Sequence, residues 1–181
     1  MRWLPILILL LLLNSLSVRA QDEYELDGSP FATANAPIPE YITPQGEKVI
    51  VVDPREHIYG AYNAKGKLIR WGLATGGSDV CSDTGGNCRT HTGTFRLYSL
   101  GSDACVSNKY PYPTGGASMP YCMYFHGGEA IHGSDDIEYD NVSHGCVRVH
   151  VSDAKWLRYH FVEGPMQANG FRGTKVIIKS Y

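Results

Sequence analysis

The residues best suited to chemistry lie in the tetrapeptide Ser143-His144-Gly145-Cys146. A thiol needs a base to become a nucleophile at neutral pH, and an imidazole is the usual one. His144 is part of this motif, and His132 lies a short way upstream. These residue types indicate a cysteine acyltransferase in which Cys146 is the nucleophile.

The general base is expected to be His132, because it ends an apolar strand and precedes a glycine, Gly133. Active-site residues often lie at such strand ends, on loops that a rigid scaffold positions. His144 is the second histidine that could reach the thiol, where it would orient the thiolate or polarise a carbonyl. The backbone N–H groups of Gly145 and Cys146 are natural donors for an oxyanion site.

The first twenty residues are typical of a secretory signal peptide. Arg2 is followed by the apolar run Leu4–Leu13, and small residues lead to a cleavage site after Ala20. An uncleaved membrane anchor is the alternative, although a spanning helix needs roughly 20 apolar residues. We therefore expect a mature protein that is periplasmic or secreted.

The cysteine count agrees with export to an oxidising compartment, where an even set of thiols should pair. The five cysteines are Cys81, Cys88, Cys105, Cys122 and Cys146. The odd one is expected to be Cys146, and the alternatives are that Cys146 is paired or that the chain dimerises through a disulfide. Four cysteines allow three pairings. We expect Cys81–Cys88 and Cys105–Cys122, because each would close a short loop in a Gly- and Ser-rich segment with little core.

Composition argues against one class of partner and indicates how the chain is divided into an arm and a domain. The 181 residues carry 16 basic and 18 acidic side chains, with a formal net charge of −2 and no long basic run. This balance argues against a nucleic-acid partner. Residues 21–46 are proline-rich and acidic and predict an irregular arm, whereas residues 47–181 suit one catalytic domain. We expect a monomer.

The elements that must position the thiol are mostly strands. Short apolar or alternating segments between turn residues predict strands at Val49–Val52, His57–Tyr62, Leu68–Ala74, Thr94–Tyr98, Tyr121–Phe125, Glu129–His132, Cys146–Val149 and Thr174–Lys179. One helix is expected after Ser152 as its N-cap, and it should end before Gly164-Pro165. The pattern indicates a mainly β fold with one helix packed against it.

The sequence resembles the L,D-transpeptidase catalytic domain, also called the YkuD domain. The resemblance rests on His132-Gly133-Ser134 followed by Ser143-His144-Gly145-Cys146-Val147-Arg148. Four further segments are similar to family elements: Leu73–Gly76, Thr92–Phe95, Met119–Tyr121 and Gly128–His132. The resemblance covers residues 47–180 and implies a YkuD-type β-sandwich of mixed and antiparallel sheets.

The resemblance also implies roles for individual residues. Cys146 would attack a carbonyl of a peptidoglycan tetrapeptide stem and release D-alanine, and His132 would activate the thiol. The main-chain carbonyl of Gly133 would orient the imidazole, and His144, Gly145 and Cys146 would line the oxyanion site. The residues expected to bind the substrate are Ser143, Arg148, Ser134, Met119 and Tyr121. No cofactor and no metal are implied.

The acceptor stays open at this level. It could be an amine of another stem peptide, an amine of a lipoprotein, or water, which would make the protein an L,D-carboxypeptidase. Two further alternatives are a zinc protein with His132, His144 and Cys146 as ligands, and a non-enzymatic surface protein stapled by disulfides. The remaining histidines are expected at the surface or behind the site: His57, His91, His126, His150 and His160. His91 stands where the family commonly has a proline.

Overall fold

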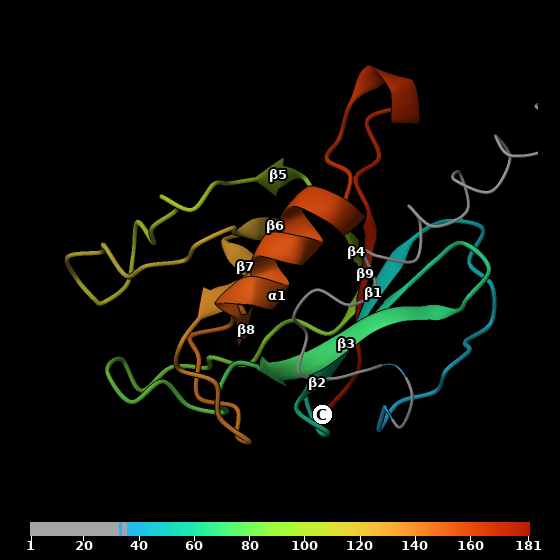
Figure 1. The fold of residues 1–181 in the computed structure, drawn as a ribbon. Coiled ribbons are helices and arrows are strands. Elements are labelled where there is room, and N and C mark those ends of the chain that lie inside the picture. Colours follow the sequence, from blue (N-terminus) through green and yellow to red (C-terminus); the bar gives the residue numbers. More distant parts are fainter. Residues whose placement is uncertain (1–32, 34–35) are drawn as a thin grey trace, which may run out of the picture.

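The computed structural model describes Thr33 and residues 36–181, and Figure 1 shows their arrangement. The expected signal peptide and most of the expected arm lie outside these residues. The strands are β1 (Val49–Asp53), β2 (Ile58–Tyr62), β3 (Leu68–Thr75), β4 (Gly93–Arg96), β5 (Ser99–Leu100), β6 (Met123–His126), β7 (Glu129–Ser134), β8 (Val147–His150) and β9 (Lys175–Ile178). Helix α1 (Val151–Trp156) continues into a π-helical turn (Leu157–Phe161), and a short 3-10 turn spans Gln167–Asn169.

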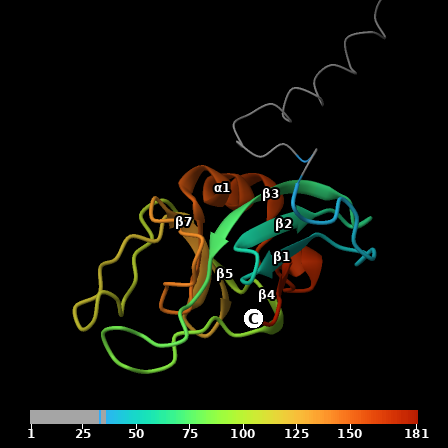
Figure 2. The ribbon, with the colours of Figure 1, turned by 90° about the horizontal axis from the view of Figure 1, so that it is seen from below.

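The strands form one continuous sheet in the order β4-β9-β1-β2-β3-β8-β7-β6-β5. The pairs β1–β9 and β7–β8 are parallel and the others antiparallel. The sheet folds over on itself, because Phe95 of β4 packs on Phe125 of β6 with ring centroids 5.5 Å apart. The two halves thus enclose a common interior, which confirms the mainly β fold expected from the sequence (Figure 2).

The main core lies between the two halves of the sheet and the helix. It is made of buried aliphatic and aromatic side chains from strands of both halves and from the helical segment: Ile50, Val52, Tyr59, Ala61, Ala74, Leu97, Met123, Phe125, Ile131, Val147, Val149, Ala154, Leu157, Phe161, Val176 and Ile178. Burial of this apolar surface is the main force holding the halves together. Strands β7 and β8, which carry the expected chemistry, run through it.

The helix begins two residues earlier than expected. Its first residue is Val151 and its N-cap is His150, without a side-chain capping bond, so Ser152 is not the cap. The reason is that β8 stays paired with β7 as far as His150, which leaves no loop before the helix. A buried ion pair instead ties the helix to the sheet, with Arg70 Nε 2.8 Å from Asp153 Oδ1.

The expected strand Thr94–Tyr98 is also divided. β4 ends at Arg96, and the N–H of Tyr98 donates to the carbonyl of Tyr124 in the other half of the sheet. The chain therefore passes from one half to the other at this point, which alternation in sequence could not indicate.

The described end of the expected arm, residues 36–46, packs on the hairpin of β2 and β3. The N–H of Leu68 donates to the carbonyl of Glu40, and the N–H of Ile42 donates to that of Gly66. Ile38 and Ile42 pack against a second apolar cluster that includes Tyr62 and Leu68. This part of the arm is irregular but covers apolar surface.

Two loops project from the same side of the molecule, one between β3 and β4 and one between β5 and β6 (Figures 1 and 2). Each loop contains one disulfide, Cys81–Cys88 in the first and Cys105–Cys122 in the second. Cys146 is free. The expected pairing of the cysteines is confirmed. Among the described residues, no helix is both long and apolar enough to span a bilayer.

Candidate active site

A pocket of about 390 Å³ lies where the second disulfide loop meets β7 and the turn before β8. It is lined by Ser107, Asn108, Lys109, Tyr110, Ala117, Ser118, Met119, Tyr124, Gly128, Glu129, His132, Ser134, Asp136, Ser143, His144, Cys146 and Arg148. Cys146 and both candidate histidines, His132 and His144, are among these residues. The structure therefore brings together the nucleophile and the two bases that the sequence suggested.

The parallel pairing of β7 and β8 brings Cys146 and His132 to one site. In this register Ile131 lies opposite Val147, and His132 lies opposite Arg148. Cys146 immediately precedes Val147, so it enters the pocket at the point where β7 carries His132. A pair of strands inside the core is a rigid support for two groups that must meet.

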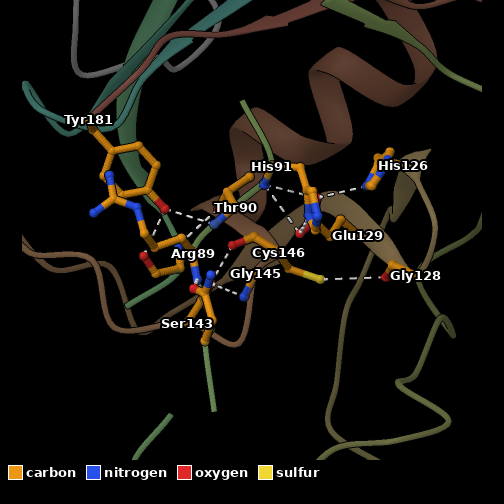
Figure 3. Close-up of polar contacts among 12 residues, drawn as sticks. Arg89, Thr90, His91, His126, Gly128, Glu129, Ser143, Gly145, Cys146 and Tyr181 are labelled. Carbon is orange, nitrogen blue, oxygen red and sulfur yellow. Dashed lines mark hydrogen bonds and ion pairs between the residues drawn. The ribbon is translucent and has the colours of Figure 1, made fainter. Parts of the chain in front are cut away.

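The thiol of Cys146 is partly buried, and its Sγ lies 3.9 Å from the carbonyl oxygen of Gly128 (Figure 3). Burial raises the pKa of the Cys146 thiol. A raised pKa favours the neutral thiol in the resting protein. A thiol in this state would need a base to act as a nucleophile.

His132 is suited to be that base. Its side chain is buried, and Nδ1 donates a hydrogen bond of 2.9 Å to the carbonyl of Gly133. Burial lowers the pKa of His132 to about 4, with a smaller contribution from the Arg148 charge. The imidazole is then neutral at pH 7 and, with its proton on Nδ1, leaves Nε2 free to accept one. At rest the pair is a thiol and a neutral imidazole, not an ion pair.

The turn that carries Cys146 is closed by Ser143. The N–H of Gly145 donates to Ser143 Oγ at 3.1 Å, and the same hydroxyl donates to the carbonyl of Cys146. The Gly145 N–H is therefore engaged within the turn. Gly145 has φ of +108°, and a Cβ there would lie 3.0 Å from Glu129 Oε1, so both conformation and space require glycine.

The end of β3 holds this turn from the other side. The N–H of Ser143 donates to the carbonyl of Gly76, and Gly77 forms a bridge to Ser143. The hydroxyl of Tyr181 donates to the Gly77 carbonyl at 2.9 Å and accepts from the N–H of Thr90 at 2.7 Å (Figure 3). The segment that the sequence suggested as a strand-to-turn element thus supports the turn that carries Cys146.

His144 lies between the two disulfide loops. Its ring stacks on Tyr110, with centroids 4.1 Å apart and planes inclined by 28°. Its Nε2 is buried without a well-aligned hydrogen bond, and Asp83 Oδ1 lies 3.0 Å from it. Tyr110 belongs to the Cys105–Cys122 loop and Asp83 to the Cys81–Cys88 loop, so both loops meet on one residue of the motif.

Four of the five residues expected to bind substrate line the pocket: Ser143, Arg148, Ser134 and Met119. Arg148 forms an ion pair with Asp136, and Ser134 Oγ accepts from the N–H of Asp136 at 3.0 Å. Tyr121 is not among the lining residues. Its backbone is left-handed, with φ of +60°, and its ring packs edge-on against Tyr159.

Glu129 is a site residue that the sequence did not single out. Its carboxylate lies in the pocket wall and contacts two histidines expected to be ordinary surface or supporting residues, His91 and His126. His91 is 38 positions from Glu129, and no spacing signal connects the two. Among the described residues, the potential metal ligands that gather in one place are these three, and His132, His144 and Cys146 do not form such a group.

Comparisons with known proteins agree with this geometry. A family model described as the L,D-transpeptidase catalytic domain (YkuD) matches residues 47–178. A search of curated proteins found no match.

Several solved structures share the fold. An L,D-transpeptidase from Xylanimonas cellulosilytica is 25% identical with a TM-score of 0.62, and the match covers 78% of this chain and 65% of that one. An L,D-transpeptidase from Mycobacterium smegmatis is 19% identical with a TM-score of 0.57, covering 74% and 59%. L,D-transpeptidase 3 from Mycobacterium tuberculosis, in complex with a faropenem-derived adduct, is 18% identical with a TM-score of 0.55, covering 74% and 60%. The chain thus spans less than two thirds of each.

Proposed function

The chain belongs to the family of L,D-transpeptidase catalytic domains, and from this premise we propose that it is a peptidoglycan L,D-transpeptidase. The observation that carries the proposal is the pairing of a free thiol, Cys146, with a buried neutral imidazole, His132, in one pocket of that domain. The proposed acyl donor is a tetrapeptide stem. Because such stems belong to the peptidoglycan, the enzyme would act in the periplasm or outside the cell, in line with the expected signal peptide.

In the first half-reaction, Cys146 Sγ attacks the carbonyl carbon between the third residue of the stem and the terminal D-alanine. The thiol proton passes to Nε2 of His132 as the carbon–sulfur bond forms. The tetrahedral intermediate then collapses, His132 returns the proton to the departing nitrogen, and D-alanine leaves. The acyl group remains on Cys146 as a thioester.

In the second half-reaction, an acceptor amine attacks the thioester. His132 takes a proton from the amine, the new amide bond forms, and the sulfur of Cys146 leaves and is reprotonated. The acceptor is another stem peptide or a protein amine such as that of a lipoprotein. If water takes this place, the product is a shortened stem and the activity is that of an L,D-carboxypeptidase.

The negative oxygen that forms during attack needs hydrogen-bond donors. We assign this role to the N–H of Cys146, because the N–H of Gly145 is engaged with Ser143 Oγ. The carbonyl of Gly133 fixes the tautomer and orientation of His132. This main-chain oxygen takes the place that a carboxylate holds in a Ser-His-Asp triad.

The pocket carries charges of both signs, which suits a stem peptide with carboxylate and amine groups. Arg148 and Lys109 are its cationic lining residues, and Glu129 and Asp136 are its acidic ones. We propose that Arg148 pairs with a substrate carboxylate and exchanges its contact with Asp136 for it. Asp136 would then be free to contact a substrate amine.

The test is mass spectrometry of the products from a disaccharide tetrapeptide. We expect a cross-linked dimer that has lost one D-alanine, and no product from Cys146→Ala, which should remain folded. Loss of D-alanine without cross-linking would assign the carboxypeptidase activity instead. Full activity of Cys146→Ala would disprove the nucleophile.

A second test uses a β-lactam, whose ring carbonyl can acylate a nucleophile in place of the stem. The relative with a faropenem-derived adduct supports this choice of probe. Carbapenems, which carry small substituents beside the ring, should acylate Cys146 and stay bound, whereas penicillins should react poorly. Intact-protein mass should rise by one carbapenem in the wild type and stay unchanged in Cys146→Ala. An equal adduct on both proteins would contradict acylation of Cys146.

A further inference from the structure

Two histidines to which the proposed acyl transfer gives no role converge on the Glu129 carboxylate at the edge of the pocket. They are His91, which lies in the loop before β4, and His126 at the end of β6, and Glu129 lies at the start of β7. His91 Nδ1 is 2.9 Å from Glu129 Oε1, and His126 Nδ1 is 3.6 Å from Glu129 Oε2. Figure 3 shows both imidazoles next to the Glu129 carboxylate, close to the turn that carries Cys146.

The spacing of these atoms suits a shared metal ion. One ligand atom from each residue lies within 4.8 Å of the other two. Two ligands bound tetrahedrally to zinc at 2.0–2.2 Å are roughly 3.4 Å apart. The imidazole nitrogens of His91 and His126 lie 2.9 Å and 3.6 Å from different oxygens of the Glu129 carboxylate, and the two ring centroids are 4.3 Å apart, so side-chain rotations would bring one atom of each residue to a shared ion.

The carboxylate is already held in place by the backbone. The N–H of His91 lies 3.3 Å from both oxygens of Glu129 and donates to them. Partners of this kind fix the orientation of a ligand and so favour metal binding. Glu129 is largely buried, whereas the rings of His91 and His126 are accessible to an ion from solvent.

The donor set points to one class of metal. Two imidazoles and one carboxylate, with an open fourth position, form the His₂Glu set of zinc sites, whereas Mg²⁺ and Ca²⁺ prefer oxygen ligands throughout. We propose that His91, His126 and Glu129 bind a divalent zinc-class ion, separately from the thiol and without a role in acyl transfer.

Such an ion would join two segments that are distant in sequence. It would tie the loop before β4 to the hairpin of β6 and β7. It would also hold Glu129 against the turn of Cys146, where a Cβ on Gly145 would lie 3.0 Å from Glu129 Oε1. Because an ion that binds only the folded state stabilises it, zinc should raise the melting temperature.

The experiment is a titration of the full chain with Zn²⁺ by calorimetry, after treatment with a chelator. We expect one ion per chain in the wild type and in Cys146→Ala. Glu129→Gln keeps the side-chain volume, and His126→Ala removes one imidazole. Each should weaken Zn²⁺ binding by more than the roughly 10- to 100-fold that follows from loss of a residue hydrogen-bonded to a metal ligand. His160→Ala, which removes an exposed histidine of the helical segment, is the matched control and should bind normally.

Melting temperatures with and without Zn²⁺ give a second readout, and circular dichroism confirms that each variant folds. Co²⁺ should give the visible bands of a tetrahedral site without a thiolate charge-transfer band. The site would be overturned if the wild type did not bind Zn²⁺, or if Glu129→Gln and His126→Ala bound it as tightly as the wild type does. Loss of binding in Cys146→Ala or in His160→Ala would equally overturn it, because the ion would then be held by other groups.

Discussion

His144 Nε2 lies 3.0 Å from Asp83 Oδ1, so a loop closed by a disulfide reaches the turn that carries the thiol. Partial burial alone would raise the pKa of Asp83, but the interaction with His144 outweighs it and lowers the pKa. A face of the same imidazole stacks on Tyr110 of the second loop. The two loops therefore fix the orientation of His144 without forming any part of the sheet.

Removing the Asp83 carboxylate should loosen His144 and slow the enzyme. For Asp83→Ala we expect kcat/KM to fall by a factor well below the ~10² expected for loss of the base, because Asp83 acts only through the orientation of His144. Steady-state kinetics on a tetrapeptide substrate measure this. Asp103→Ala, in the other disulfide loop, is the control and should be unaffected. If Asp83 acts through His144, its effect should vanish in a His144→Asn background; additive effects would show that the two residues act independently.

The two histidines of the site should differ in importance. His132→Asn should lower kcat by on the order of 10² or more, because it removes the base that takes the thiol proton. His144→Asn should cost less, since His144 supports the turn and takes no proton in the proposed mechanism. Single-turnover acylation rates of both variants provide the comparison. If His144→Asn were the more damaging change, the two roles would have to be exchanged.

The pKa of His132 predicts an acid-sensitive fold. Burial lowers its pKa to about 4 from the ordinary 6.5, so between these values the unfolded chain binds a proton that the folded protein does not. The free energy of unfolding should therefore fall as the pH decreases from 6.5 to 4, by on the order of 3 kcal/mol from this residue. Urea unfolding of the wild type and His132→Gln at several pH values isolates the contribution, because other groups cancel. Parallel curves for the two proteins would contradict the low pKa.

The disulfide Cys105–Cys122 should matter for both stability and substrate binding. Its loop contributes Lys109 and Tyr110 to the pocket wall. Replacing both cysteines by serine should lower the free energy of unfolding by about 2–4 kcal/mol, because the unfolded chain gains freedom. KM should rise as the wall loosens. Denaturant titration and steady-state kinetics measure the two effects. Replacing Cys81 and Cys88 by serine is the matched control. The Cys81–Cys88 disulfide closes a shorter loop, so its loss should lower the free energy of unfolding by less. A larger loss of stability without Cys81–Cys88 than without Cys105–Cys122 would contradict this prediction.

Much of the fold could be predicted from local sequence. The apolar and alternating segments predicted most strands to within one or two residues, because burial of one strand face imposes that pattern on neighbouring positions. Boundaries failed where a distant contact decided them. β4 ends at Arg96, where the chain crosses between the halves of the sheet. The helix begins at Val151, because β8 stays paired with β7 as far as His150.

The chemistry divides in the same way. The sequence by itself determined the candidate thiol and the histidine next to a glycine, because these depend on residue type and short spacing. It predicted the disulfides Cys81–Cys88 and Cys105–Cys122 among three possible pairings, and the structure contains them. Only the tertiary structure decided that Tyr121 packs against Tyr159 and does not line the pocket, and that His91 meets His126 and Glu129. Those outcomes depend on which strands pair and where loops cross, and contacts between residues dozens of positions apart leave no periodic signal in the chain.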